Sequence, residues 1–300
     1  MTQAQKNTKL KNRVLELLDG VHTQDKEQEA VKLPPGLGLL KFTKQTSIEA
    51  LLYEPVVCLI LQGEKEITLG NRVLRIGAGD SLVVSHDIPV MSRVTQASAT
   101  EPYLAIIVDL DLAILRGLYD QMDDINHNQD NNHSLDFAHT DPDLLDALDR
   151  YLALINKPAE AKVMAPLILK EIHFRLLLAS QGGMLRQLIW HDSHASRISR
   201  AMQQIRQNFR GQVMIPELAK GVGMSSSSFH QHFKSITATT PLQYLKDLRL
   251  LEARRLLQSG GDSVSNIAFE VGYESPTQFS REYARKFGAS PRHDLSVVAA

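Results

Sequence analysis

A short pattern of residues occurs twice near the C-terminus, between Ile215 and Pro291. The two copies are offset by 49 residues up to a glycine and by 50 residues after it. The first copy comprises Leu218, Ala219, Val222, Gly223, Phe229, Phe233 and Pro241, and the second comprises Ile267, Ala268, Val271, Gly272, Phe279, Tyr283 and Pro291. Each copy predicts one helix, a tight turn at the glycine and a second helix.

The second helix of each predicted unit is amphipathic. Its two aromatic residues are spaced i, i+4 and therefore lie on one face, directed at a core. The opposite face is polar and partly basic, with His230, Gln231 and Lys234 in the first unit and Gln278, Arg281 and Arg285 in the second. Such a face is typical of a helix that reads the DNA major groove.

The stretch between the two units predicts a single amphipathic helix over Pro241–Gln258, which ends at Gly260-Gly261. A further helix is expected before the first unit, over Ser196–Phe209. The polar joint at residues 191–195 precedes it. We therefore expect an all-helical C-terminal domain over residues 196–295.

The C-terminal third is basic, whereas the rest of the chain is acidic. Residues 196–300 hold 14 Lys and Arg against 8 Asp and Glu, and residues 1–195 hold 19 against 26. The net charges are therefore +6 and −7. This asymmetry favours a polyanion such as nucleic acid as the partner of the C-terminal third alone.

The composition favours a globular protein of the cytoplasm. A chain of 300 residues suggests two domains. Its one cysteine, Cys58, excludes an internal disulfide and is compatible with a reducing compartment. No apolar run approaches the ~20 residues of a membrane span, and Met1–Gly20 has no signal-peptide core.

Residues Leu33–Leu110 predict short strands separated by glycine turns, a pattern typical of a sandwich or small barrel. The most apolar strand is Val56–Gln62, which is closed by Gly63. A barrel of this size can enclose one small ligand. The alternation along Val56–Gln62 does not decide which side chains would line that cavity.

The segments that flank the barrel are less regular. Residues 1–32 predict a short helix over Leu10–Leu18 within an otherwise mobile N-terminal arm. The segment Asp123–His139, rich in Asn, Asp and His, predicts a solvated loop.

Two long helices are expected as a connector after this loop, which completes an N-terminal domain over residues 33–190. One is capped by Asp141 and ends at Lys157-Pro158, and the other runs from Ala161 to Ser180 and is closed by Gly182-Gly183. Both are apolar enough to bury a face against a second subunit, so a homodimer is one hypothesis.

The barrel sequence carries no recognisable catalytic arrangement. Metal-dependent barrels need several converging His and carboxylate ligands, and His86 is the single histidine between residues 33 and 110. We therefore expect no metal, no cofactor and no enzyme activity. Cys58 is expected to be a buried strand residue; the alternative is a redox sensor.

The motifs of the C-terminal third resemble the AraC/XylS family of transcription regulators, whose DNA-binding domain has two helix-turn-helix units joined by a linker helix. The matching residues are Leu218-Ala219, Gly223-Met224-Ser225, Phe229, Phe233-Lys234, Pro241-Leu242-Gln243-Tyr244-Leu245, Arg249-Leu250, Ala253-Arg254, Ile267-Ala268, Val271-Gly272-Tyr273, Phe279-Ser280-Arg281, Tyr283 and Phe287-Gly288-Ala289-Ser290-Pro291. This resemblance covers about 100 residues.

The N-terminal part is similar to the AraC-type, cupin-like regulatory domain, in a YqhC-like subgroup of aldehyde-responsive regulators. The matching residues are Pro55–Gly63, Lys65, Gly79-Asp80, His86–Val90 and Pro102-Tyr103-Leu104. The resemblance implies an α+β protein in which a cupin-like barrel and a helical connector precede the DNA-binding domain.

The resemblance also implies a function: a bacterial, cytoplasmic one-component regulator that binds double-stranded DNA. Activation is the commoner behaviour of the family, which implies RNA polymerase as a partner. The effector would be a small molecule, and the subgroup points to an aldehyde. The alternatives are a barrel that serves only for dimerisation and a cupin-type enzyme.

Site residues follow from the same resemblance. In relatives, the base-facing positions of the two reading helices correspond here to Ser226, Ser227, His230 and Gln231, and to Pro276, Thr277, Gln278 and Arg281. Lys234, Lys286 and the helix N-termini are expected to contact phosphates, which position a protein without specifying sequence. His232 is expected to be structural rather than base-reading.

Overall fold

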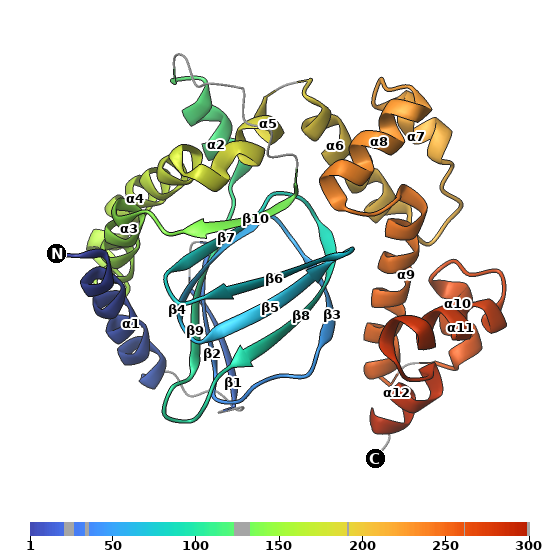
Figure 1. Ribbon diagram of the computed structural model, residues 1–300, viewed down its shortest axis with the longest axis horizontal. Helices are drawn as coiled ribbons and strands as arrows, with labels where there is room; N and C mark the ends of the chain where they lie inside the picture. Colours follow the sequence, from blue (N-terminus) through green and yellow to red (C-terminus); the bar gives the residue numbers. More distant parts are fainter. Residues whose placement is uncertain (21–26, 34–35, 123–132, 191, 261, 299–300) are drawn as a thin grey trace.

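The computed structural model describes residues 1–20, 27–33, 36–122, 133–190, 192–260 and 262–298. A β-rich N-terminal domain lies at the centre of Figure 1, with helices over one side and a helical C-terminal region against the other. This arrangement confirms the predicted α+β fold.

Two antiparallel sheets form the β-rich domain. The larger sheet has the strand order β1-β2-β9-β4-β7-β10, and the smaller has the order β3-β8-β5-β6. The first consists of β1 (Gln28–Leu33), β2 (Leu37–Phe42), β9 (Tyr103–Asp109), β4 (Val56–Gln62), β7 (Asp80–Val84) and β10 (Leu135–His139). The second consists of β3 (Glu49–Tyr53), β8 (Ile88–Gln96), β5 (Glu64–Leu69) and β6 (Arg72–Gly77).

Strand β4 contributes to two different cores because its side chains alternate between the faces of the sheet. Val57, Leu59 and Leu61 belong to the core shared with the covering helices. Cys58 and Ile60 belong to the core between the two sheets. The alternation that the sequence left open is thereby settled, and Cys58 is a buried strand residue, 1% exposed.

The chain passes from the larger to the smaller sheet at Gly63, between β4 and β5. Gly63 has φ +80°, and a Cβ there would lie 2.4 Å from the carbonyl oxygen of Gln96. A register shift interrupts the β4–β9 pairing immediately before it, between Ile60 and Gln62. Only glycine satisfies both the dihedral angle and this close approach.

The N-terminal helix is longer than predicted and is part of the core. Helix α1 spans Gln3–Asp19, and Leu10, Val14 and Leu18 on its inner face are at most 1% exposed. The prediction of a mobile arm around a short helix is therefore wrong, since residues 28–33 also form strand β1. Residues 21–26 lie outside the described part of the chain.

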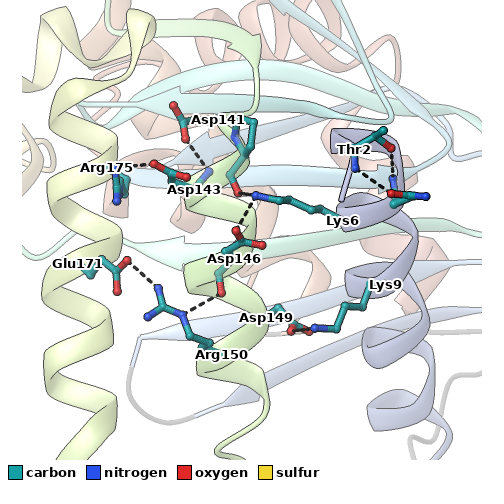
Figure 2. A network of polar contacts seen from close by, with 12 residues as sticks. Thr2, Lys6, Lys9, Asp141, Asp143, Asp146, Asp149, Arg150, Glu171 and Arg175 are labelled. Carbon is teal, nitrogen blue, oxygen red and sulfur yellow. Dashed lines mark hydrogen bonds and ion pairs between the residues drawn. The ribbon is translucent and has the colours of Figure 1, made fainter.

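Ion pairs also join α1 to helix α3 (Pro142–Leu152), and further ion pairs join α3 to α4 (Pro158–Leu178), as Figure 2 shows. The ion pairs from α1 to α3 are Lys6–Asp146 at 2.5 Å, Lys9–Asp149 at 2.7 Å and Arg13–Asp149 at 2.6 Å. Those from α3 to α4 are Arg150–Glu171 at 2.6 Å and Asp143–Arg175 at 2.8 Å. Each of the pairs from α1 to α3 keeps one partner at least 30% exposed, and ion pairs open to solvent contribute little individually, so the apolar face of α1 supplies most of its anchoring.

The connector differs from the prediction in two places. Residues 135–139, expected within a solvated loop, form strand β10 and pair with β7; residues 123–132 of that loop lie outside the described residues. Gly182-Gly183 does not cap the second long helix, because that helix already ends at Leu178; the short 3-10 turn η1 (Ser180–Gly182) and helix α5 (Gly183–Ile189) follow it. Helix α2 (Leu112–Tyr119) precedes β10.

The two long connector helices, α3 and α4, differ in the kind of side chain that they expose. Asp141 caps α3, with Pro142 in its first turn, as predicted. The outward positions of α3 are charged, whereas α4 leaves Val163, Leu167 and Leu178 more than half exposed. No helix of the described residues is long and apolar enough to cross a membrane.

The C-terminal region is all helical, and its long helix α9 has the predicted bounds Pro241–Gln258. The other helices are α6 (His194–Asn208), α7 (Ile215–Gly221), α8 (Ser226–Thr237), α10 (Val264–Glu270), α11 (Pro276–Phe287) and α12 (Pro291–Val298). In Figure 1, α9 lies alongside the barrel, with α7 and α8 near one end and α10 to α12 near the other.

One apolar core continues from the interior of the barrel into the first helix-turn-helix unit. It joins barrel residues such as Ile60 and Ile88 to Ile198 of α6, Phe229 of α8 and Tyr244 of α9. The Tyr244 hydroxyl donates a hydrogen bond to the Asp87 carbonyl oxygen at 2.8 Å. The second unit has a separate core, which includes Ile267, Phe279 and Tyr283.

Leu10→Ala should test the anchoring of α1. The substitution removes a fully buried side chain, so we expect it to lower the free energy of unfolding by about 2–5 kcal/mol. Asn12→Ala, on the exposed face of the same helix, should change it by less than about 0.5 kcal/mol. Urea unfolding monitored by circular dichroism measures both, and equal small effects would show that α1 is not anchored.

Candidate nucleic-acid interface

The two glycine turns have the predicted backbone conformation but different surroundings. Gly223, between α7 and α8, has φ +68°, and Gly272, between α10 and α11, has φ +91°. A Cβ at Gly272 would lie 2.5 Å from the carbonyl oxygen of Arg210, whereas the nearest atom at Gly223 is the Arg197 Nη1 at 3.5 Å. The second turn is therefore the more strictly glycine-dependent of the two.

Helix α8 begins at a side-chain cap and is fixed by its aromatic face. Ser225 caps it by accepting from the Ser228 N–H at 3.3 Å. Phe229 and Phe233 are fully buried, and the Phe233 ring contacts the Tyr244 ring of α9 with centroids 5.5 Å apart. Packing of these rings orients the opposite face of α8 outward.

The outward face of α8 carries the predicted contact residues Ser226, Ser227, His230, Gln231 and Lys234, all of which are exposed. The C-terminal end of the helix meets the barrel instead. The Ser134 N–H donates to the Ile236 carbonyl oxygen at 2.8 Å, and the His133 ring lies 3.2 Å from the Ser235 carbonyl oxygen. The N-terminal half therefore remains accessible, and that half of a recognition helix contacts base edges.

Helix α11 presents a comparable surface at the second unit. Ser275 caps it by accepting from the Gln278 N–H at 3.3 Å. Thr277, Gln278 and Arg281 are exposed, and Pro276 is half-buried. The guanidinium of Arg281 has no hydrogen bond or ion pair to any described residue, so it is free to bind a ligand outside the chain.

The buried carboxylate of Glu282 joins α11 to α9 and holds a side chain of the exposed face of α11. Glu282 accepts hydrogen bonds from the Lys246 ammonium at 2.7 Å, the Tyr273 hydroxyl at 2.8 Å and the Gln278 amide at 3.2 Å. Burial raises the pKa of Glu282, but the hydrogen bonds from these three partners and the charge of Lys246 outweigh it and lower the pKa overall. The cluster joins α9 to α11 and holds the Gln278 side chain, which the sequence did not predict.

Lys286 lies in a different setting from the other predicted contacts. Its ammonium forms an ion pair with Asp247 of α9 at 2.7 Å, and both side chains are less than one fifth exposed. This pair fixes α11 to the linker helix. A phosphate contact by Lys286 stays a prediction, and it would require exchange of this partner.

His232 of α8 packs against α6, the first helix of the C-terminal region. Its ring stacks on the ring of His194 from α6, with centroids 3.7 Å apart. Burial, and secondly the neighbouring His194, lower the pKa of His232. The stacking agrees with the predicted structural role of this residue.

The linker helix fixes the separation of the two reading helices. Its 18 residues span about 27 Å at 1.5 Å per residue, which is comparable to the ~34 Å between successive major grooves on one face of DNA. Arg249 of α9 anchors the helix to the chain before the first unit by donating to the carbonyl oxygens of Phe209 at 2.7 Å and Gly211 at 2.8 Å. The two units are therefore placed by one rigid element.

The barrel contains a second candidate site, a cavity of about 690 Å³. Its polar lining includes Tyr53, Cys58, Lys65 and Tyr103, and Arg206 of α6 lies at its mouth. The sequence did not predict this cluster, because Tyr53, Cys58, Lys65 and Tyr103 lie on four different strands, β3, β4, β5 and β9, and become neighbours only when the sheets close. No group of three or more His, Cys, Asp and Glu within the described ranges is arranged to hold a metal ion.

His86 is not a cavity ligand but a contact between domains. Its Nδ1 lies 2.8 Å from the Ser85 hydroxyl, and its Nε2 lies 3.2 Å from the Ala195 carbonyl oxygen, to which the N–H donates. Burial lowers its pKa to about 4. The neutral ring therefore links the barrel to the start of α6.

Glu282→Gln should show how the second unit depends on a charged carboxylate. Because the pKa of Glu282 is lowered in the folded protein, its stabilising effect is complete above the ordinary Glu pKa of about 4.3. That effect is lost as the pH falls through the lower folded-state value. Urea unfolding should therefore show the variant less stable than the wild type at about pH 7, and this difference in stability should be smaller at about pH 3.

The matched control for Glu282→Gln is Glu217→Gln, which alters an exposed carboxylate on α7. The control should unfold like the wild type at both pH values. A stability gap for Glu282→Gln that is the same at both pH values would contradict a role for its charge.

Sequence comparisons place both halves of the chain in known families. The model of the AraC-type transcriptional regulator N-terminus matches residues 34–184, about half of the chain, and a helix-turn-helix domain model matches residues 218–295. VirF of Yersinia enterocolitica, a virulence regulon transcriptional activator, is 25% identical over 152 residues, which is 50% of this chain and 55% of VirF. RhaS of Escherichia coli, a transcriptional activator, is 32% identical over 124 residues, 41% of this chain and 44% of RhaS.

The match to these curated relatives thus spans about half their length. The crystal structure of ToxT from Vibrio cholerae, described as bound to an unsaturated fatty acid, covers 92% of this chain and 97% of ToxT with a TM-score of 0.56 and 9% identity. At that identity the likeness concerns the fold. The family models and the two-domain architecture agree: the chain belongs to the AraC family of transcription regulators, with an AraC-type N-terminal domain and a C-terminal helix-turn-helix domain.

Proposed function

We propose that this chain is a sequence-specific DNA-binding activator controlled by a small molecule held in its barrel. The observation that carries the proposal is the pair of reading helices, α8 and α11, each with an exposed polar N-terminal half and each attached to the same linker helix. The basic charge of residues 196–300 supplies the attraction to DNA phosphates.

In the proposed complex, α8 and α11 enter successive major grooves on one DNA face. Arg281 reads guanine, for which a bidentate guanidinium is suited, and Gln231 reads adenine. Ser226, Ser227, His230, Pro276, Thr277 and Gln278 complete the base-facing surfaces. Lys234 and, after exchange of its Asp247 partner, Lys286 contact phosphates.

We propose that a small molecule binds in the barrel cavity. Arg206 could transmit its binding to the DNA-binding region. Arg206 belongs to α6, yet it lines the cavity and forms ion pairs with Glu54 and Asp87 of the barrel. A ligand that competes for these charges would alter the contact between the barrel and α6. Two effector classes enter the proposal: an aldehyde, from the resemblance to a YqhC-like subgroup, and a fatty acid, from the ToxT relative.

The proposal includes two protein partners. Activation implies contact with RNA polymerase in the bacterial cytoplasm. The exposed side chains Val163, Leu167 and Leu178 on α4 support a homodimer, because an apolar helix face of this kind is stabilised by burial against a second copy. The domain limits we propose are 196–295 for DNA binding and 1–190, instead of the 33–190 expected from the sequence, for the regulatory part, because α1 and β1 belong to its core.

Arg281→Ala tests the DNA-reading assignment. If Arg281 reads a base, the variant should lose about 1–3 kcal/mol of binding free energy on the specific site and should relax the preference at one base position. The measurement is fluorescence anisotropy with the selected site and with single-base variants of it, at fixed salt.

Arg292→Ala serves as the control, because it removes an exposed arginine from α12 rather than from a reading helix. It should weaken binding to all sequences equally and slightly. An Arg281→Ala variant that loses the same affinity on specific and random DNA would instead identify a phosphate contact.

A further inference from the structure

We propose that Lys65 forms a head-group site for a carboxylate-bearing amphiphile at the closed part of the barrel cavity. The inference rests on the proposed small-molecule role of the barrel and specifies the ligand class. It follows from the position of one buried ammonium, from the absence of a carboxylate partner for it, and from the apolar lining beside it.

Lys65 lies on β5 with its side chain directed between the two sheets. The residue is 6% exposed, and its ammonium lies 3.5 Å from the Tyr53 hydroxyl and 3.6 Å from the Cys58 sulfur. The Tyr53 ring lies 5.2 Å from the same nitrogen. The contact to the Tyr53 oxygen is long for a hydrogen bond, and a cysteine sulfur is a weak acceptor, so neither group compensates a full positive charge as a carboxylate would.

The ammonium of Lys65 has no carboxylate counter-ion within the described part of the chain. No ion pair joins its ammonium to an Asp or Glu carboxylate there. Two carboxylates that line the cavity, Glu54 and Asp87, pair with Arg206 at the mouth instead. An uncompensated buried charge is costly, so an incoming anion gains an unusually strong partner at this point.

The protonation state of Lys65 favours a carboxylate over an aldehyde. Burial lowers the pKa of Lys65, but the neighbouring Cys58, Tyr103 and Tyr53 raise it above its ordinary value. An aldehyde would form an imine only with the neutral amine, with loss of water. An ammonium instead donates hydrogen bonds to a carboxylate, and such charge-assisted bonds are the stronger kind.

The remainder of the lining suits an apolar tail. Side chains of Phe42, Leu52, Val56, Leu82 and Ile107 line the same cavity. Its volume of about 690 Å³ is within the range of pockets that hold small organic ligands. The ammonium of Lys65 beside these apolar side chains matches a ligand with one anionic end and a hydrocarbon body.

The test compares octanoate with octan-1-ol, which shares its chain but has no charge, by isothermal titration calorimetry on the full-length protein. The wild type should bind octanoate at least about tenfold more tightly than octanol, since a hydrogen bond to a charged group contributes about 1.5–3 kcal/mol. Lys65→Met, of similar size, should lose this preference while it still binds octanol. Lys65→Arg should retain it.

Lys32→Met is the matched control, because Lys32 is an exposed lysine at the rim of the same cavity. It should keep the preference for octanoate. Equal binding of octanoate and octanol by the wild type, or an undiminished preference in Lys65→Met, would overturn the anion site and leave the cavity's small-molecule role standing. No binding of either probe by the wild type would contradict both.

Octanal distinguishes the competing chemistry. Treatment of the octanal complex with borohydride would trap an imine as a stable amine on Lys65, detectable by peptide mass spectrometry. We expect no such adduct. Its formation in the wild type, and not in Lys65→Arg, would replace the carboxylate proposal with an aldehyde site.

Discussion

The apolar core shared by the barrel and the first helix-turn-helix unit is the constraint on which the rest of the structure depends. Burial of Ile198, Phe229 and Tyr244 against barrel residues removes water from both sides of the contact at once. The Tyr244 hydroxyl and the neutral His86 ring provide the polar contacts at its edge. A change in the barrel therefore reaches α6, α8 and α9 through packed side chains rather than through a flexible linker.

The two reading units consequently differ in what holds them. The first is packed into the barrel core, and the C-terminal end of its reading helix contacts the chain near β10. The second has its own core around Phe279 and Tyr283, together with the buried Glu282 cluster and the Lys286–Asp247 pair against α9. In the regulator that we propose, a signal from the barrel acts directly on the first unit and reaches the second along the linker helix.

The sequence predicted the features that depend on local patterns. Pro241 and the spacing of apolar residues located α9, and the glycines located both turns. It failed where distant contacts decide. Helix α1 is held by a core that its own weak periodicity does not show, and β10 is a strand because β7 supplies its hydrogen bonds. The Lys65 cluster was invisible for the same reason, since alternation along a strand does not say which face closes over a cavity.

The coupling between barrel and first unit can be measured by native-state hydrogen exchange of the full-length protein in low urea, because amides that open in one cooperative unit share one opening free energy. The shared core predicts that the slowest amides of α8 open with those of β4 and β9, and that those of α11 open separately at lower free energy. If α8 opened together with α11 and independently of the barrel strands, the C-terminal region would be an autonomous unit, and the proposed coupling through the core would be wrong.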